Sequence, residues 1–210
     1  MTESAVLLAS GGLDSTTLAY WLRERSITYA PLFLNYGQHC ASTEYETLRR
    51  VMPPEIAIDT MDISTVYAHS SSRLIKEANL WEEDVKYEEL YLPYRNLMLL
   101  TVAAAHAQSI GCHTVFAGFI NSNHAKEIDC SADFFERLST LLGTVGSVQI
   151  QMPFRFMSKY DVAKEALRLG APIAQTFSCQ VSSTVPCGAC PNCVDRLDAL
   201  RKISAEMNGE

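Results

Sequence analysis

Four cysteines near the end of the chain have the spacing of a metal site. They follow the pattern C-x7-C-x2-C-x2-C, and the two-residue gaps let tight turns bring the sulfur atoms to one centre. Four thiolates would close a tetrahedral site with no open position, so we expect a structural zinc ion. An iron–sulfur cluster is the alternative, although in ferredoxin-type runs the fourth cysteine follows the other three, whereas here it precedes them. The expected ligands are Cys179, Cys187, Cys190 and Cys193.

A second stretch with chemistry-bearing residues, SGGLDSTT, lies near the start of the chain. Two glycines end an apolar run and precede a helix-like segment, a setting in which backbone amides approach phosphate oxygens. Asp14 could hold a magnesium ion on those phosphates. The stretch has neither the lysine of the G-x-x-x-x-G-K-[ST] loop nor a third glycine, and a tight helix-capping turn is the alternative. The residues expected to form this phosphate loop are Leu8, Ala9, Ser10, Gly11, Gly12, Leu13, Asp14, Ser15, Thr16, Thr17 and Leu18.

The composition is that of a globular protein. A chain of 210 residues, 48% hydrophobic and 20% charged, can bury one core and is not expected to be disordered. The net charge of -7 argues against broad, sequence-independent contact with a nucleic-acid backbone, although a nucleotide could bind in a local pocket. No run approaches the roughly 18 apolar residues of a membrane span. No basic leader precedes the first apolar run, and the odd number of clustered cysteines fits a reducing compartment, so we expect a cytoplasmic protein.

Short apolar runs alternate with segments of helical composition. Such alternation predicts parallel β-α-β units with helices on both faces of one sheet, and ligands at the carboxyl ends of the strands. Ser158 and Asp161 have the spacing of a capping box at one helix start. The expected strands are residues 5–8, 28–34, 55–63, 114–120 and 147–154, and the expected helices are 16–25, 43–51, 97–109, 132–142 and 158–169.

Two regions depart from this alternation. Residues 64–91 are polar, rich in serine and then in glutamate, and are expected as an irregular excursion that forms a lid or a partner surface. The other region follows Gly170 and contains the cysteines and a short helix over 194–207. We therefore expect an α/β domain over 1–175, with residues 176–210 as a metal-binding segment and helix packed on it.

The sequence resembles a known enzyme family. SGGLDSTT is similar to the pyrophosphate loop of the N-type ATP pyrophosphatases, α/β enzymes that cleave ATP between the α and β phosphates and adenylate a substrate oxygen. Together with the four-cysteine pattern, it resembles the 7-cyano-7-deazaguanine synthase family over nearly the whole chain. Further family-like stretches follow in order: NYGQH (35–39), PYRN (93–96), Asp129 with Cys130, MPFRFMSK (152–159) and FSCQ (177–180).

The resemblance implies a five-stranded parallel sheet of the adenine nucleotide alpha hydrolase type and a carbon–nitrogen ligase. Such an enzyme uses ATP to adenylate 7-carboxy-7-deazaguanine, lets ammonia displace AMP to give the amide, and uses a second ATP to form the nitrile. ATP, magnesium and zinc are the implied cofactors, and a homodimer is the implied assembly. Asp14 and Lys159 would be catalytic. The residues that would contact substrate are Gln38, Arg95, Asn96 and Asp129.

The sequence also departs from the family pattern. The family usually has a glycine where this chain has Tyr94, and its D-x-S-G-Y-P-D-C-R segment is replaced over 121–131, where only Asp129 and Cys130 stay in register. These changes put the second substrate in doubt. One alternative is a relative that joins the activated deazaguanine to a protein or peptide amine; divergent relatives of the family occur in antiphage defence operons, and some are associated with joining the deazaguanine to a protein amino terminus. The other is a non-catalytic nucleotide- or zinc-binding module.

Overall fold

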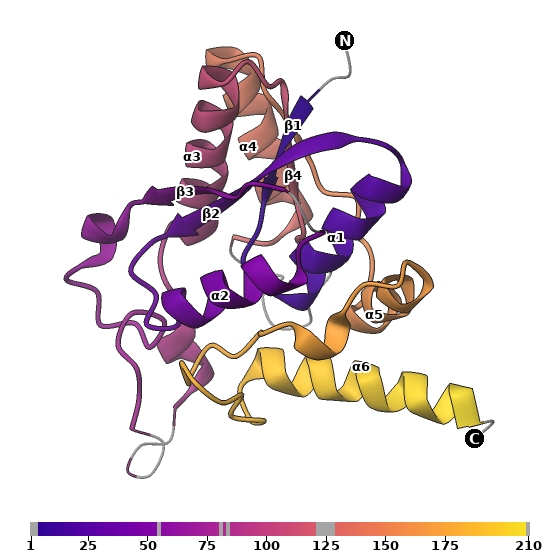
Figure 1. Ribbon diagram of the computed structural model, residues 1–210. Coiled ribbons are helices and arrows are strands. Elements are labelled where there is room, and N and C mark those ends of the chain that lie inside the picture. Colours follow the sequence, from indigo (N-terminus) through magenta and orange to yellow (C-terminus); the bar gives the residue numbers. More distant parts are fainter. Residues whose placement is uncertain (1–3, 54–55, 80–81, 83–84, 121–128, 209–210) are drawn as a thin grey trace.

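The computed structural model describes residues 4–53, 56–79, 82, 85–120 and 129–208 (Figure 1). At its centre lies a five-stranded sheet in the order β3-β2-β1-β4-β5, and all its strand pairs are parallel. The strands are β1 (Ser4–Leu8), β2 (Thr28–Asn35), β3 (Asp59–Asp62), β4 (Thr114–Ala117) and β5 (Gln149–Gln151). The helices are α1 (Leu13–Glu24), α2 (Ala41–Val51), α3 (Arg95–Ser109), α4 (Ala132–Val145), α5 (Lys159–Arg168) and α6 (Pro191–Asn208), with short 3-10 helices η1 (Ser64–Tyr67), η2 (Tyr87–Leu90) and η3 (Ile173–Gln175).

The sheet separates two hydrophobic cores because successive side chains of a strand point to opposite faces. Leu7 and Phe116 belong to one core, whereas Val6 and Val115 belong to the other. Helices α1, α2 and α5 cover the first face and α3 and α4 the second, while α6 packs against α5 (Figure 1). The predicted parallel sheet with helices on both faces is confirmed.

Three strands are shorter than the sequence predicts, and one of them, predicted over 114–120, ends at Ala117 as β4. Within the predicted strand 55–63 only β3 pairs with β2, and Ile58 packs against the first core without joining the sheet. Within the predicted strand 147–154 only β5 pairs with β4, and Phe154 lies outside it, 1% exposed and edge-on to Trp21. In these last two places the apolar pattern reflects burial rather than strand pairing.

Local signals fix the helix ends. The Ser158 hydroxyl accepts a hydrogen bond from the Asp161 amide while the Asp161 carboxylate accepts one from the Ser158 amide, so the predicted capping box starts α5. Helix α6 starts at Pro191, three residues before the predicted start at Val194, because proline is well suited to a first helical position.

The excursion between β3 and α3 packs against the cysteine segment. It contains η1 and η2 and runs beside the chain that leads into α6 (Figure 1). Leu74, Leu90 and Leu92 share a third buried cluster with Phe177 and Val181. The irregular conformation therefore encloses a small core of its own, away from both faces of the sheet.

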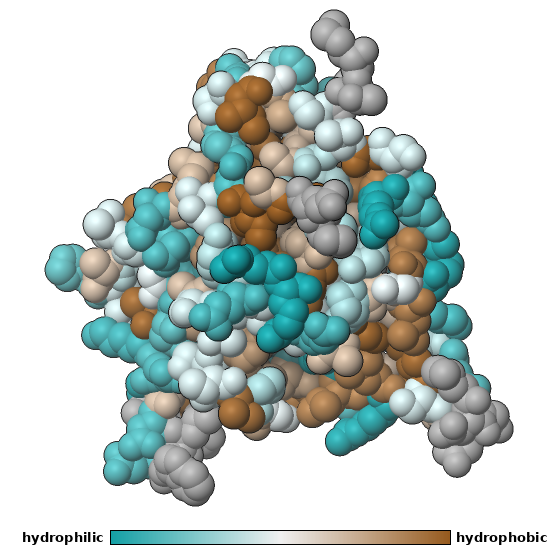
Figure 2. All heavy atoms as spheres, in the orientation of Figure 1, coloured by the Kyte–Doolittle hydropathy of each residue, from teal (hydrophilic) through white to brown (hydrophobic). Residues whose placement is uncertain are grey.

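Hydrophilic residues occupy much of the face seen in Figure 2, with smaller apolar areas between them. None of the helices in the described part of the chain is both long and apolar enough to cross a membrane.

The residue before α3 has a left-handed backbone. Tyr94 has φ 61° and ψ 8°, a region that the Cβ of a bulky residue disfavours, and its side chain is 72% exposed. The turn still forms because the Tyr94 carbonyl accepts a hydrogen bond from the Met98 amide in the first turn of α3. The position therefore suits the glycine that the family pattern has there.

We predict that Tyr94→Gly raises the free energy of unfolding by about 1 kcal/mol, because glycine removes the left-handed strain while little side-chain packing is lost. Urea denaturation would show a higher midpoint at an unchanged m-value. Tyr94→Ala is the matched control, since it keeps the Cβ and should gain nothing. Equal stabilisation by alanine, or destabilisation by glycine, would contradict this explanation.

Candidate functional site

The loop after β1 is held so closely that only glycine fits at one position. Gly11 has φ +75°, and a Cβ there would lie 2.7 Å from the Leu48 amide nitrogen and 2.8 Å from the Glu44 carbonyl oxygen. On the other side, a Cβ on Gly118 would lie 3.1 Å from the Ser15 amide nitrogen. The loop is therefore wedged between α2 and the end of β4.

The start of α1 offers donors to an anion. Its N-cap, Gly12, has no side chain to accept the first-turn amides, so these amides have no intrahelical partner and face outward from the helix end. The Ser15 hydroxyl donates to the Gly12 carbonyl and accepts from the Ser10 amide, which closes the turn. A helix N-terminus of this kind favours phosphate oxygens.

An ion pair joins this helix start to α5. Lys159 Nζ lies 2.6 Å from Asp14 Oδ2, and the two side chains are 13% and 24% exposed. The second carboxylate oxygen, Asp14 Oδ1, is buried and has no hydrogen-bond partner among the described residues. A buried acceptor without a partner is unfavourable unless a ligand satisfies it, and a carboxylate oxygen beside a phosphate-binding helix end is a suitable ligand for Mg²⁺. The residues present therefore fit both a phosphate group and its cation.

These groups open into one cavity of about 730 Å³ at the carboxyl ends of the strands. The cavity also contains Gln38, Arg95, Asn96 and Asp129, so every residue expected to contact substrate lies on its wall together with Asp14 and Lys159. Of the expected phosphate loop, the residues on the wall are Leu8, Ala9, Ser10, Gly12, Leu13, Asp14 and Ser15.

The remaining loop residues lie behind the wall. Thr16, Thr17 and Leu18 are fully buried, and the Thr17 hydroxyl donates back to the Leu13 carbonyl at 2.7 Å. Gly11 is absent from the wall because it packs against α2. These four residues shape the loop, and none of them lies on the cavity wall.

Arg95 and Asn96 join α3 to the segment that follows β4. Asn96 is 1% exposed, and its Nδ2 donates to the Asp129 carbonyl at 3.1 Å and to Cys130 Sγ at 3.0 Å. Its Oδ1 accepts from Arg95 Nε, which orients the guanidinium. Burial would lower the pKa of Arg95, but the neighbouring ionisable groups of Tyr36, Asp129, Cys130 and Glu44 raise it overall, so the Arg95 guanidinium stays positively charged in the cavity.

Burial raises the pKa of the Cys130 thiol to about 11, which makes it a neutral group on the cavity wall.

Of the altered segment 121–131, residues 121–128 lie outside the described part of the chain. The expectation that this segment selects the second substrate therefore stays a prediction.

Glu44 was not singled out from the sequence, yet it lies on the cavity wall. Burial raises the pKa of its carboxyl group to about 7, and hydrogen bonds from Gln38 and Cys40 offset this only in part. The Gln38 amide is committed within the protein, since it donates to Leu34 and Glu44 and accepts from the Tyr36 amide. Gln38 therefore positions Glu44, and the stretch NYGQH was the sole sequence signal near this pair.

The four cysteines converge as predicted. Their sulfur atoms all lie within 4.8 Å of one another, compared with about 3.8 Å between sulfurs that are each 2.3 Å from a tetrahedral zinc ion. The amides of Ser182 and Cys187 donate to Cys179 Sγ, and the amide of Cys190 donates to Cys187 Sγ. Hydrogen bonds from the Cys190 thiol and from these amides lower the pKa of Cys179 to about 4. The Cys179 thiolate is thus stabilised, whereas the hydrogen bond with Cys179 raises the pKa of Cys190 and burial raises that of Cys193 to about 11; the four sulfurs could hold a metal ion with a closed set of ligands.

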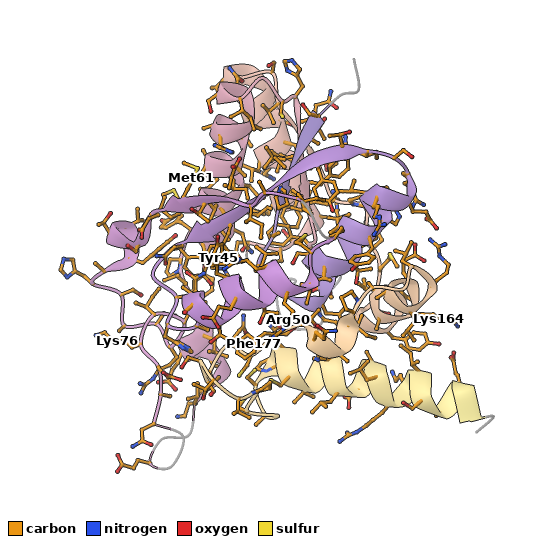
Figure 3. All side chains as sticks on the ribbon, in the orientation of Figure 1. Tyr45, Arg50, Met61, Lys76, Lys164 and Phe177 are labelled. Atoms are coloured by element: carbon orange, nitrogen blue, oxygen red, sulfur yellow. The ribbon has the colours of Figure 1, made fainter. Side chains whose placement is uncertain are left out.

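The cysteine segment also forms one wall of the cavity. The Phe177 amide donates to the Gly11 carbonyl at 3.2 Å, and the ring of Phe177 lies between α2 and α6 (Figure 3). Ser178 and Gln180 line the cavity, and the Gln180 carbonyl lies 3.2 Å from His39 Nε2. A metal ion in the cysteine cluster would therefore order residues that touch the phosphate loop.

Comparison with solved structures identifies the fold. A 4-thiouridine synthetase in complex with RNA and bound ATP is 14% identical, with a TM-score of 0.56 over 97% of this chain and 51% of its own. The NMN synthetase from Francisella tularensis is 16% identical, with a TM-score of 0.51 over 100% of this chain and 78% of its own. These two likenesses show that the chain shares the fold of both proteins, a parallel sheet with helices on both faces.

Sequence comparison identifies the family. Residues 4–204 match the family described as Queuosine biosynthesis protein QueC, and the chain belongs to this family. The 7-cyano-7-deazaguanine synthase of Methanoculleus marisnigri is 32% identical over 214 residues, which cover 97% of this chain and 96% of the relative. That of Marinobacter nauticus is 33% identical over 207 residues, which cover 95% and 93%.

We predict that the purified chain carries one metal ion and that Cys190→Ser loses it. Without the ion, the buried thiolates repel one another, so the free energy of unfolding should fall by at least about 3 kcal/mol. This loss is a fraction of the roughly 10–16 kcal/mol that structural zinc contributes to small peptides. Elemental analysis and thermal melting would measure both effects. Cys112→Ser is the control, because Cys112 lies in the second core away from the cluster. Full metal content and stability in Cys190→Ser would show that the cluster holds no structural ion.

Proposed function

We propose that this protein is an ATP-dependent carbon–nitrogen ligase that converts 7-carboxy-7-deazaguanine to 7-cyano-7-deazaguanine. The relatives named 7-cyano-7-deazaguanine synthase support the product. The observation that carries the chemistry is the Asp14–Lys159 ion pair at the open N-terminus of α1, in the same cavity as Arg95. Lys159 and Arg95 would supply positive charge to the ATP phosphates and the substrate carboxylate, the start of α1 would supply backbone donors, and Asp14 would orient Lys159.

Two nucleophilic steps would produce the amide. A carboxylate oxygen of the substrate attacks the α-phosphorus of ATP, and the bond to the departing pyrophosphate breaks. Lys159 and the first-turn amides of α1 stabilise the pyrophosphate charge. Ammonia then attacks the acyl carbon and loses a proton, and AMP leaves with the former carboxylate oxygen.

The nitrile requires a second round at the same site. The amide oxygen attacks the α-phosphorus of a second ATP, and pyrophosphate leaves again. Loss of both amide protons and departure of AMP leave a carbon–nitrogen triple bond. Mg²⁺ bound through Asp14 Oδ1 would neutralise phosphate charge in both rounds.

Zinc is our proposal for the metal of the cysteine cluster, because four thiolates with backbone N–H donors suit a closed tetrahedral site. We also propose that residues 176–210 extend the domain of residues 1–175, since Ala199 and Ile203 of α6 belong to the first core. The seven cysteines are free thiols, which supports a cytoplasmic location, while the homodimer rests on the family resemblance alone.

Ammonia is the proposed acceptor. Transfer of the acyl group to a protein or peptide amine is the competing chemistry, and its contacts would come from the altered segment 121–131, most of which lies outside the described residues. A test of product identity separates the two.

We predict that the protein, incubated with ATP, Mg²⁺, ammonium and 7-carboxy-7-deazaguanine, forms 7-cyano-7-deazaguanine and AMP, detected by mass spectrometry. Omission of ammonium should stop nitrile formation. AMP release with only the amide would remove the second round from the proposal, and AMP release with only a peptide conjugate would replace ammonia as the acceptor. Absence of AMP with every amine would refute the ligase.

We further predict that Asp14→Asn weakens binding of Mg²⁺-ATP at least about tenfold, because it removes one charge-assisted ligand. Calorimetric titration with and without Mg²⁺ would measure the change. Asp133→Asn is the matched control: Asp133 also lies in the first turn of a helix and pairs with Arg137, but it is exposed on α4. The metal content of the cysteine cluster in Asp14→Asn should equal that of the unaltered protein, which shows that the variant is folded. Unchanged affinity for Mg²⁺-ATP in such a folded variant would show that Asp14 does not belong to the proposed site.

A further inference from the structure

Glu44 is a carboxyl group held rigidly inside the cavity. It lies in the first turn of α2, and its Oε2 accepts a hydrogen bond from Gln38 Nε2 at 2.9 Å. Gln38 is 4% exposed, and its amide is fixed by the Leu34 carbonyl and the Tyr36 amide. The donor that orients Glu44 therefore has no freedom to turn away.

Within the described part of the chain, no cationic side chain forms an ion pair with the carboxyl group of Glu44, and Arg95 acts on it through its charge at longer range. The Gln38 amide and the Cys40 thiol each donate one hydrogen bond to this partly buried carboxylate, whose two oxygens can accept about four. Because Glu44 lies on the wall of the ligand cavity, its remaining acceptor positions are open to donors of a ligand.

The two proposed ligands, the 7-deazaguanine substrate and ATP, differ in the hydrogen-bonding groups on the edges of their rings. An ionised carboxylate only accepts hydrogen bonds, and its two oxygens match two adjacent N–H groups. The six-membered ring of 7-deazaguanine presents such a pair, the ring N–H and the neighbouring amino group. The corresponding edge of adenine has an amino group beside an unprotonated ring nitrogen, and that nitrogen would face a carboxylate oxygen with two lone pairs in opposition.

We propose that the Glu44 carboxylate recognises the pyrimidine edge of the 7-deazaguanine ring by accepting from both its ring N–H and its amino group. This inference rests on the proposed function. Glu44 is then the residue that selects a guanine-type ring, while Gln38 positions it. The phosphate loop and the ion pair at α1 remain available for ATP.

The test compares two ligands, 7-carboxy-7-deazaguanine and its analogue without the amino group. The unaltered protein should prefer the first by about 100-fold or more in kcat/KM, because a site built for a donor is left unpaired by the analogue. Glu44→Gln should reduce this preference to about tenfold or less, since it replaces an acceptor by a donor that meets the ligand amino group. The KM for ATP should stay unchanged. Glu46→Gln is the matched control, because Glu46 is exposed on the same helix.

Calorimetric binding of both ligands without ATP gives a readout that does not depend on turnover. If the unaltered protein binds the ligands with the stated preference but releases no AMP, the proposed function fails and the role of Glu44 stands. Full preference retained in Glu44→Gln would overturn the inference. A raised KM for ATP in Glu44→Gln with the preference intact would also overturn it, since Glu44 would then contact adenine. Failure of the unaltered protein to bind either ligand would overturn it as well.

Discussion

The strand order places β1 between β2 and β4, and the rest of the site depends on this arrangement. The chain winds outward from β1 to β3, then crosses to the other side of β1 before it forms β4 and β5. Helices that follow β1 and β3 consequently cover opposite faces of the sheet, and the carboxyl end of β1 opens into the gap between them. The Gly11 loop must pass through this gap, where α2 lies on one side and the end of β4 on the other. This close packing leaves room for an anion at the start of α1 but for no side chain at Gly11.

The two ends of the chain complete one site. The hydrogen bond from the Phe177 amide to the Gly11 carbonyl attaches the cysteine segment to the phosphate loop, and the excursion between β3 and α3 packs against the same segment in the third core. A metal ion bound by the four thiols would therefore act on the cavity through the wall that it orders, at a distance from the reacting groups. Helix α5 contributes to the same site. A capping box fixes the start of this helix, and Lys159, its first residue, forms an ion pair with Asp14.

Sequence patterns predicted the elements better than the contacts between them. Buried parallel strands carry continuous apolar runs and the cysteine spacing is local, so the sheet, the helices and the metal cluster could be inferred. The ion pair between Asp14 and Lys159 joins residues 145 positions apart and depends on how α5 packs against α1, which no local pattern encodes. The local sequence around Glu44 predicts only a helix residue, and its place in the cavity depends on the hydrogen bond from Gln38. Thr17 shows the opposite case, since the sequence predicts it as part of the phosphate loop but its hydroxyl donates to the Leu13 carbonyl within α1.

The central claim is that ATP activates the carboxylate of a 7-deazaguanine by adenylation in this cavity. The fate of the carboxylate oxygens tests it most directly. With 7-carboxy-7-deazaguanine labelled with oxygen-18 in both carboxylate positions, each AMP released on the way to the nitrile should carry one labelled oxygen, and the pyrophosphate should carry none. Label in pyrophosphate or inorganic phosphate, or unlabelled AMP, would contradict transfer through an acyl adenylate.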